Sequence, residues 1–122
     1  MTRVMFYKNE KGVQPVAEFI RNLAERKDKT SRINLNKIRD YIRILELYGT
    51  NIGEPYTKHI VDKIWELRPL RNRILFVVWY NDTYILLHCF IKKTQKTPRR
   101  EIEKAQKELE NIIKRSENNG KR

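Results

Sequence analysis

Two periods of apolar residues alternate along the chain and divide it into strands and helices. Residues 3–8 (RVMFYK) predict a short opening strand. Residues 15–23 and 35–45 repeat apolar side chains at intervals of three and four, which is typical of amphipathic helices. The first helical face consists of Val16, Phe19, Ile20 and Leu23, and the second of Leu35, Ile38, Tyr41, Ile42 and Leu45.

The ends of these two helices are marked by residues with known capping preferences. Pro15 suits the first turn of a helix. After a polar break at residues 27–29, either Thr30 or Ser31 can cap the second helix. Gly49 lies just past its end, where a glycine commonly terminates a helix. Because the link between them is short, the two helices predict a helical hairpin.

A strand-forming region follows the helices. Residues 49–59 contain two glycines and a proline and predict a loop. Residues 64–96 predict three consecutive strands, because β-branched and aromatic residues are frequent there. Polar breaks at residues 69–72 and at Asn81 and Asp82 separate these strands.

A last helix is predicted to begin at Thr97, a capping residue, with Pro98 in its first turn. The resulting order, strand-helix-helix-strand-strand-strand-helix, predicts an α+β fold with a small, mainly antiparallel, four-stranded sheet. We expect a single domain over residues 1–116 and a flexible polar tail over residues 117–122. The apolar stripe of the last helix consists of Ile102, Ala105, Leu109 and Ile112.

The charge of the chain indicates its class of partner. The 122 residues carry a formal net charge of +12, and the sequence pI is about 10.0. Such a balance favours a polyanionic partner, either nucleic acid or an acidic protein. Residues 56–100 hold ten Lys or Arg and three Asp or Glu. Most of the excess charge therefore lies in and around the predicted strands.

Cysteine usage and hydropathy bear on the compartment. The single cysteine, Cys89, cannot form an intramolecular disulfide, and we expect a reduced, buried thiol. The opening residues show no apolar leader, and no apolar run approaches the ~18 residues of a membrane span. We therefore expect a cytoplasmic protein that does not contact a membrane.

Basic residues cluster at the predicted strand ends. Arg68 and Arg73 flank the first connection, and Lys92, Lys93 and Lys96 follow the last strand. Arginine binds phosphate oxygens in a bidentate manner and stays charged, so we interpret the cluster as a site for RNA phosphate. The sequence contains no metal-ligand spacing, phosphate-binding loop or paired carboxylates. Any catalysis is therefore expected from arginine and lysine.

RNA suits such a site because its 2′-hydroxyl is a nucleophile. Cleavage then needs a base, cations that stabilise the charge on the phosphate, and an acid for the 5′-oxygen. A lysine can act as the base where burial and neighbouring cations lower its pKa. Strand alternation places Glu66 and Arg68 on one face. Either Lys92 or Lys93 can point toward Arg68, and Lys93 is favoured.

The two histidines are interpreted differently. His88 stands within an apolar strand and is expected to be packed and hydrogen-bonded. His59 lies in a polar loop beside Tyr56 and Lys58, where a functional role is more plausible.

Arg99 and Arg100 are unusual in the first turn of a helix, because they oppose the helix dipole. One explanation is an anion that docks at the helix N-terminus. The other is that Glu101 and Glu103 offset the two arginines locally. The sequence does not decide between them.

The segments IWELRPLRNRILFVVWY and YILLHCFIKKTQKTPRREIEKA resemble the HigB-like, phage-derived branch of the RelE/ParE toxin superfamily. In that branch an L-[WY]-E-L-R strand and an R-[IVF]-[LF] strand precede a K-K-T-x-K-T-P segment that leads into a helix. The resemblance covers Lys63 to about Ala105, and the preceding strand and helices also fit this fold.

The resemblance implies the toxin of a type II toxin–antitoxin pair. Such a toxin is an mRNA interferase that cleaves mRNA on the translating ribosome without a metal or other cofactor. Its partner would be a HigA-like helix-turn-helix antitoxin, in a heterotetramer that binds operator DNA through the antitoxin. By position, Arg68 and Arg73 would stabilise the phosphate, and Lys93 would supply the base or further charge. The other residues predicted to contact RNA are Tyr56, Lys58, His59, Phe90, Lys92, Lys96, Arg99 and Arg100.

The sequence departs from the family pattern at one point. Some HigB toxins use a histidine near the C-terminus as the base, but no histidine follows His88 here. The base therefore remains one of four candidates, namely Lys92, Lys93, Lys96 or His59.

Two other functions are compatible with the resemblance. One is a ParE-like inhibitor of DNA gyrase, since the superfamily fold supports both activities. The other is a non-catalytic module that binds RNA or the ribosome. Substitutions in such a module would weaken binding uniformly and reduce its salt dependence.

Overall fold

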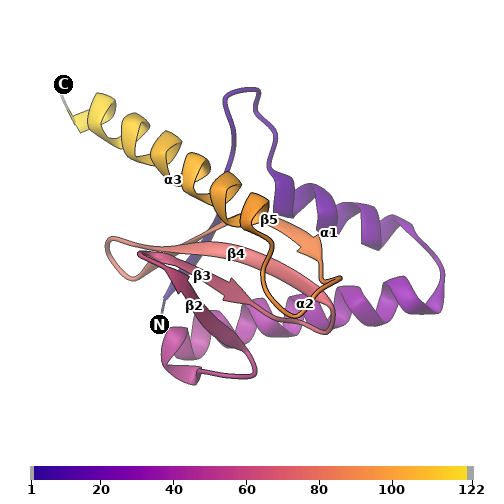
Figure 1. The fold of residues 1–122 in the computed structure, drawn as a ribbon. Coiled ribbons are helices and arrows are strands. Elements are labelled where there is room, and N and C mark those ends of the chain that lie inside the picture. The colour runs from indigo at the N-terminus through magenta and orange to yellow at the C-terminus, as the bar shows by residue number, and fades with distance from the viewer. Residues whose placement is uncertain (1, 121–122) are drawn as a thin grey trace.

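A twisted five-stranded sheet lies between two layers of helices in the computed structural model (Figure 1). The structure describes residues 2–120, with side chains up to Asn118. The predicted α+β class is confirmed. In chain order the elements are β1 (Arg3–Phe6), α1 (Pro15–Glu25), α2 (Lys29–Tyr48), a 3₁₀ helix η1 (Gly49–Ile52), β2 (Thr57–Val61), β3 (Ile64–Leu67), β4 (Asn72–Trp79), β5 (Thr83–Ile91) and α3 (Arg99–Gly120).

The strand order of the sheet is β1-β5-β4-β3-β2. Strands β2 to β5 form an antiparallel meander. Strand β1 lies at the edge of the sheet next to β5. It pairs with β5 in parallel, from the pair Arg3–Thr83 to the pair Phe6–Leu86. A parallel pair requires a crossover, which begins here with α1 and α2. The predicted turn at Asn81 and Asp82 is confirmed, since both residues have the positive φ of a tight hairpin turn.

The sheet has one strand more than the four predicted, because β2 begins within the predicted loop at residues 49–59. The glycines and proline of that segment interrupt the chain only before Thr57. From there β2 pairs with β3 in an antiparallel register. Its Lys58 and His59 side chains are exposed, as is common on an edge strand. The strand therefore lacks the apolar alternation that would have predicted it.

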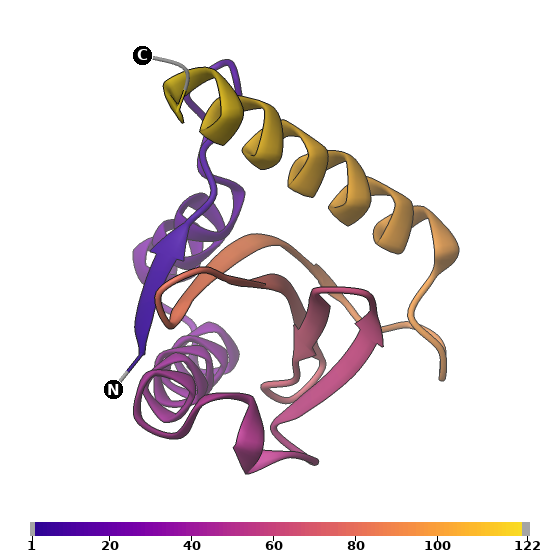
Figure 2. The ribbon, with the colours of Figure 1, turned by 90° about the vertical axis from the view of Figure 1, so that its left-hand side faces the viewer.

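Each face of the sheet has its own hydrophobic core. Helices α1 and α2 cover one face (Figure 2), where Phe76 packs with Ile38. Helix α3 covers the other face, where Leu75 and Leu87 pack with Ala105. Each large side chain buried in this way stabilises the fold by roughly 1.5–3 kcal/mol. The two cores together fix the sheet between its helices.

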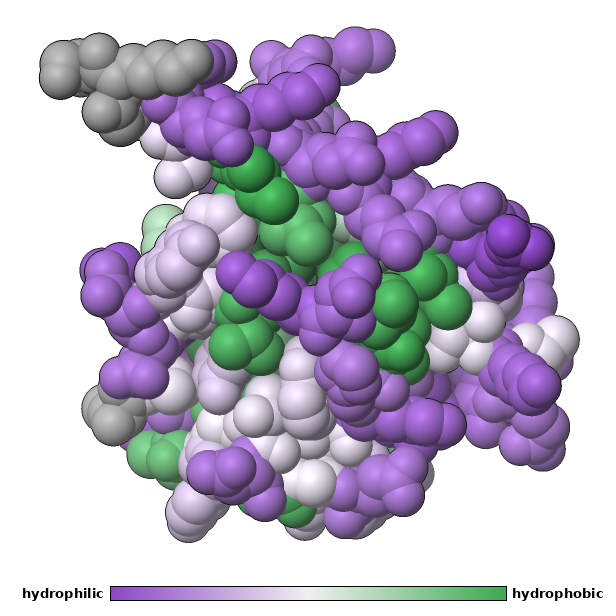
Figure 3. Space-filling model, turned by 60° about the vertical axis from the view of Figure 1, so that its left-hand side comes forward, coloured by the Kyte–Doolittle hydropathy of each residue, from purple (hydrophilic) through white to green (hydrophobic). Residues whose placement is uncertain are grey.

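Because α3 alone covers its face, the second core is only partly shielded from solvent. Figure 3 shows apolar side chains exposed between the hydrophilic surface of α3 and the sheet. The half-buried residues packed against the second core include Ile60, Val61, Trp79, Leu109 and Ile112.

None of the helices within residues 2–120 is long and apolar enough to cross a membrane.

Helix α2 begins earlier than predicted, at Lys29, and its cap is Asp28 instead of Thr30 or Ser31. The Asp28 carboxylate accepts hydrogen bonds from the Ser31 N–H and the Ser31 hydroxyl, both at 2.9 Å. These hydrogen bonds lower the pKa of Asp28. A carboxylate at this position also interacts favourably with the positive end of the helix dipole.

Helix α3 begins at Arg99, after Pro98, whose carbonyl accepts the first N–H bonds of the helix. The prediction that Thr97 caps this helix is wrong, because its hydroxyl donates to a carboxylate on β3. The helix continues past Ser116 to Gly120. Residues 121–122 of the predicted tail lie outside the described residues, and the fraying expected there stays a prediction.

A β-bulge in β5 determines which of its side chains face α3. The register with β4 shifts between Leu75 and Phe76, which makes Leu87 the extra residue. Leu87 and His88 consequently both face α3. Alternation then resumes, and Phe90 points to the same side. Without the bulge, His88 and Phe90 would face the helical hairpin.

Gly49 ends α2 in the left-handed region, with a φ of 65°. A Cβ atom at this position would lie 2.7 Å from the hydroxyl oxygen of Tyr84. That hydroxyl accepts a hydrogen bond of 3.1 Å from the Thr50 N–H, and the Tyr84 side chain is buried. Gly49 therefore permits both the turn and the close approach of β5.

We expect Gly49→Ala to lower the free energy of unfolding by about 2–4 kcal/mol, from backbone strain together with displacement of Tyr84. Gly12→Ala is the matched control. Its φ is 81°, but a Cβ atom there meets nothing within 4 Å. The control should lose only about 1 kcal/mol. Urea unfolding measures both, and equal losses would show that the contact with Tyr84 is unimportant.

Candidate active site

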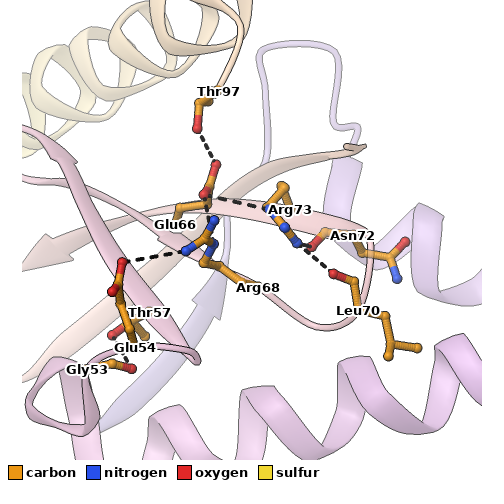
Figure 4. Close-up of polar contacts among 9 residues, drawn as sticks. All are labelled: Gly53, Glu54, Thr57, Glu66, Arg68, Leu70, Asn72, Arg73 and Thr97. Carbon is orange, nitrogen blue, oxygen red and sulfur yellow. Dashed lines mark hydrogen bonds and ion pairs between the residues drawn. The ribbon is translucent and has the colours of Figure 1, made fainter. Parts of the chain in front are cut away.

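The Glu66 side chain is the most buried charged group at the loop end of β3 and β4 (Figure 4). It is only 2 % exposed. Its Oε1 lies 3.5 Å from Nε of Arg68 and 3.8 Å from Nε of Arg73. Its Oε2 accepts a hydrogen bond of 2.7 Å from the Thr97 hydroxyl. Because burying an unpaired carboxylate is costly, these partners allow Glu66 to occupy this position.

The antiparallel pairing of β3 with β4 brings the two arginines to the same side. The last pair of the register is Leu67 with Ile74. The register continued by one residue sets Arg68 opposite Arg73, and side-chain alternation turns both toward the face that carries Glu66. The two guanidinium groups therefore lie on one surface, as the site hypothesis requires.

Arg73 is fixed by the connection between β3 and β4. Its Nη1 donates to the carbonyls of Leu70 and Asn72, both at 2.8 Å. Leu70 has a φ of 58°, a left-handed conformation that costs an L-residue roughly 1–2 kcal/mol. Leu70 is 45 % exposed, so core packing does not explain this conformation. The strained turn instead directs a carbonyl at Arg73.

Arg68 is held less tightly than Arg73. Its Nη1 lies 3.7 Å from Oε1 of Glu54, whose side chain is 67 % exposed. Its Nε is buried and has no hydrogen-bond partner among the residues that the structure describes. Ion pairs with such exposed carboxylates are weak. A bound anion can therefore displace Glu54 and engage the guanidinium of Arg68.

The charge balance at this point is positive, since two guanidinium groups face one buried carboxylate. Burial and, to a lesser extent, the charge of Arg68 lower the pKa of Arg73 below its ordinary value. Arginine nevertheless keeps its charge in neutral solution. The effective dielectric constant is lower here than in water, so the excess charge attracts anions strongly.

Lysines form the outer rim of this site. Arg68 and Arg73 line a narrow hollow together with residues 92–98, and Lys93 also lines a wider hollow beside it. Two hydrogen bonds tie this segment to the β3–β4 connection. The Lys92 N–H donates to the Arg71 carbonyl at 2.7 Å. The Lys92 carbonyl in turn accepts a hydrogen bond of 3.1 Å from the Arg71 side chain, through Nη2. The predicted cluster of cations is thus present in the fold.

Three residues on or just before β2 that were predicted to contact RNA do not lie together in the structure. Lys58 pairs with Glu66 and shares its face of the sheet. His59 pairs with Trp65 and so points to the opposite face. The ring of Tyr56 packs against Tyr41, with the centroids 5.0 Å apart. Lys58 is therefore on the same face as the arginines, and His59 is not.

Arg99 and Arg100 both have acidic neighbours. Arg99 Nε lies 3.9 Å from Glu103, and Arg100 Nε lies 3.7 Å from Glu101. Both arginine side chains remain at least 80 % exposed. Glu101 and Glu103 therefore partly offset the charge of the two arginines, which is one of the two explanations that the sequence left open. The effect is weak because the ion pairs are solvated.

His88 links β5 to α3 and is buried and hydrogen-bonded, as predicted. Its Nδ1 lies 2.6 Å from Oε1 of Glu108, and its Nε2 lies 3.0 Å from Oε1 of Glu101. A neutral imidazole donates from one nitrogen only, so these contacts require a proton on both nitrogens or on a carboxyl.

No group of three or more His, Cys, Asp or Glu within residues 2–120 could hold a metal ion.

The role of Glu66 was not predicted from the sequence. Carboxylates were considered there only as acid–base pairs, and all the chemistry was expected from cations. Alternation already placed Glu66 beside Arg68, and a carboxylate between two arginines is the signal that could have identified it. Thr97 was assigned to the helix end, although its hydroxyl completes the hydrogen bonding of Glu66.

One family model matches this chain. It is described as phage derived protein Gp49-like (DUF891), and it matches residues 19–110. The chain belongs to this family, which is part of the RelE/ParE-like toxin group. Membership of a toxin-like family implies an antitoxin partner. No curated protein matches the sequence significantly.

We expect Glu66→Gln to lower the free energy of unfolding by about 1–3 kcal/mol, because two arginines lose their shared counter-charge. Glu110→Gln is the matched control, since it removes the same charge from the exposed side of α3. It should change stability by less than about 0.5 kcal/mol. Urea unfolding compares the two variants, and a Glu66→Gln protein as stable as the control would contradict the structural role.

Cys89 is a free, partly buried thiol, and burial raises its pKa from 9.0 to about 12. Between these values the unfolded chain loses a proton that the folded chain keeps. The free energy of unfolding should therefore fall as the pH rises above 9, by up to about 1.4 kcal/mol per pH unit from this group. Urea unfolding at pH 8 and pH 10 measures the loss, and Cys89→Ala should show a smaller one. Equal losses in the wild-type and Cys89→Ala proteins would show that Cys89 does not cause the loss of stability.

Proposed function

We propose that this chain is the toxin of a type II toxin–antitoxin pair and an endoribonuclease that cleaves mRNA on the translating ribosome. The observation that carries the proposal is the approach of Arg68 and Arg73 to a single buried carboxylate, Glu66. This arrangement leaves positive charge facing a rim of exposed lysines. Membership of the Gp49-like family supports the toxin class.

RNA is the substrate that suits these side chains, because its own 2′-oxygen can attack the phosphorus. In this step a base removes the 2′-hydroxyl proton and the bond from O2′ to phosphorus forms. The bond from phosphorus to O5′ breaks, and O5′ takes up a proton. The products are a 2′,3′-cyclic phosphate and a 5′-hydroxyl end. Arg68 and Arg73 bind the non-bridging oxygens, whose charge grows in the transition state.

Lys93 is our candidate for the group that removes the proton or adds positive charge. It lines both hollows beside the arginines and is exposed to solvent. Lys92 and Lys96 extend the cationic rim along the strand of RNA. His59, the reserve candidate for the base, is turned to the other face of the sheet. The proposal assigns no step to a metal ion or other cofactor.

The antitoxin is proposed to be a HigA-like helix-turn-helix protein. The net charge of +12 favours an acidic partner, because opposite charges accelerate association and increase its specificity. We propose a heterotetramer that contacts operator DNA through the antitoxin.

We expect Arg68→Ala to abolish growth arrest on induced expression and to lower the rate of mRNA cleavage at least about 100-fold, since a donor to the transition state is lost. Arg43→Ala is the matched control. It removes the same charge and one solvated ion pair, with Glu46, from α2. Mapping of new mRNA 5′ ends, with and without a translation block, measures cleavage and its dependence on the ribosome.

Other outcomes of the same experiment identify the competing functions. Growth arrest with intact mRNA and trapped gyrase–DNA complexes would contradict the ribonuclease proposal and favour a gyrase inhibitor. Cleavage by the Arg68→Ala protein at the wild-type rate would contradict the assignment of Arg68. RNA binding by the wild-type protein without cleavage would favour a non-catalytic module that binds RNA or the ribosome.

A further inference from the structure

We infer that the open hollow between α1, the end of β5 and the start of α3 binds a nucleobase next to the scissile phosphate. The hollow has a volume of about 910 Å³, which is sufficient for a nucleotide. This inference rests on the proposed ribonuclease function and adds to it a subsite for a base. The residues that carry the argument are Phe19, Phe90, Ile91, Lys96, Pro98 and Arg99.

The hollow is continuous with the arginine site. Phe90, Lys93, Lys96 and Pro98 line both the narrow hollow over Arg68 and Arg73 and the large one. A phosphate held by the arginines would thus place its attached nucleoside beside Phe90. Three other hollows in the described part of the chain share no aromatic residue with the arginine site.

The lining has the composition expected of a site for single-stranded nucleic acid. Two half-buried aromatic rings, Phe19 and Phe90, offer flat apolar surfaces on which a base can stack. Exposed cations stand at the rim, where they can follow the phosphate backbone. Among the lining residues only Glu101 is acidic, and its carboxylate is already engaged by His88.

The edge of β5 adds polar groups to this apolar wall. Strand β1 pairs with β5 only over residues 83–86, and the Tyr7 N–H adds one bond to the Leu86 carbonyl. On that side, residues 87–91 have no neighbouring strand in the described part of the chain. Their outward main-chain groups can therefore hydrogen-bond the edge of a stacked base.

Phe19 is the residue that distinguishes a base pocket from the phosphate site. It comes from α1, it lines only the large hollow, and it carries no charge. Loss of its ring should therefore affect recognition of the base and leave contacts to phosphate unchanged. Phe6 is the matched control, because it is a partly exposed phenylalanine of β1 that does not line the hollow.

The experiment measures binding of a short, labelled RNA with 2′-O-methyl sugars, which lacks the free hydroxyl needed for cleavage. A second series of the same RNA has an abasic nucleotide at each position in turn. We expect Phe19→Ala to weaken binding of the intact RNA by about 5- to 150-fold. At one position the abasic RNA should bind wild type and Phe19→Ala equally. The salt dependence of binding should be unchanged, and Phe6→Ala should bind like wild type.

Equal weakening of the intact RNA and of every abasic RNA would overturn the inference, and so would unchanged binding by Phe19→Ala. Phe19→Leu and Phe19→Tyr guard against a folding defect, since both keep apolar bulk in the core. Leucine should lose most of the discrimination between base and abasic site, and tyrosine should retain it. If Phe19→Ala shows the base-dependent loss of RNA binding but the wild-type protein cleaves no mRNA, only the proposed function is contradicted. If the wild-type protein cleaves mRNA but Phe19→Ala shows no such loss, only the base pocket is contradicted.

Discussion

The buried carboxylate of Glu66 is the constraint on which the candidate site depends. Two guanidinium groups repel each other, and bringing both to one point of the sheet requires a negative charge between them. Glu66 supplies that charge from β3 and receives a hydrogen bond from Thr97, just before α3. Its single negative charge is shared by two guanidinium groups and so does not neutralise both. The same residue therefore stabilises the local fold and leaves the surface positive enough for a phosphate.

The sheet determines the content of the site through its register. Antiparallel pairing of β3 with β4 brings Arg68 and Arg73 to one face. The bulge at Leu87 then turns Phe90 to that face as well. One inserted residue thus changes the alternation of β5 in the middle of the strand. Before the bulge, the side chains of β5 alternate between the two cores as in a regular strand. After the bulge, the ring of Phe90 lies on the same face as the arginines.

The sequence predicted those features that depend on neighbouring residues. Helical faces, the Asn81–Asp82 turn and the cationic strand ends all follow from short patterns, and the structure contains them. Strand β2 was missed because its exposed side chains lack apolar alternation. Phe19 was assigned only to a core face, because the approach of α1 to the end of β5 depends on packing between distant segments. The buried role of Glu66 likewise requires knowledge of three elements at once.

The parallel pairing of β1 with β5 has a consequence for synthesis of the protein. Strand β1 must wait for residues 83–86 before it can pair with β5, and Glu66 must wait for Thr97. Contacts of such long separation form late and only after most of the chain is available. A nascent chain interrupted before this point has its arginines but not the support that aligns them. If the chain is the toxin proposed above, the ribosome that makes it is exposed to a competent enzyme only after Thr97 has been synthesised.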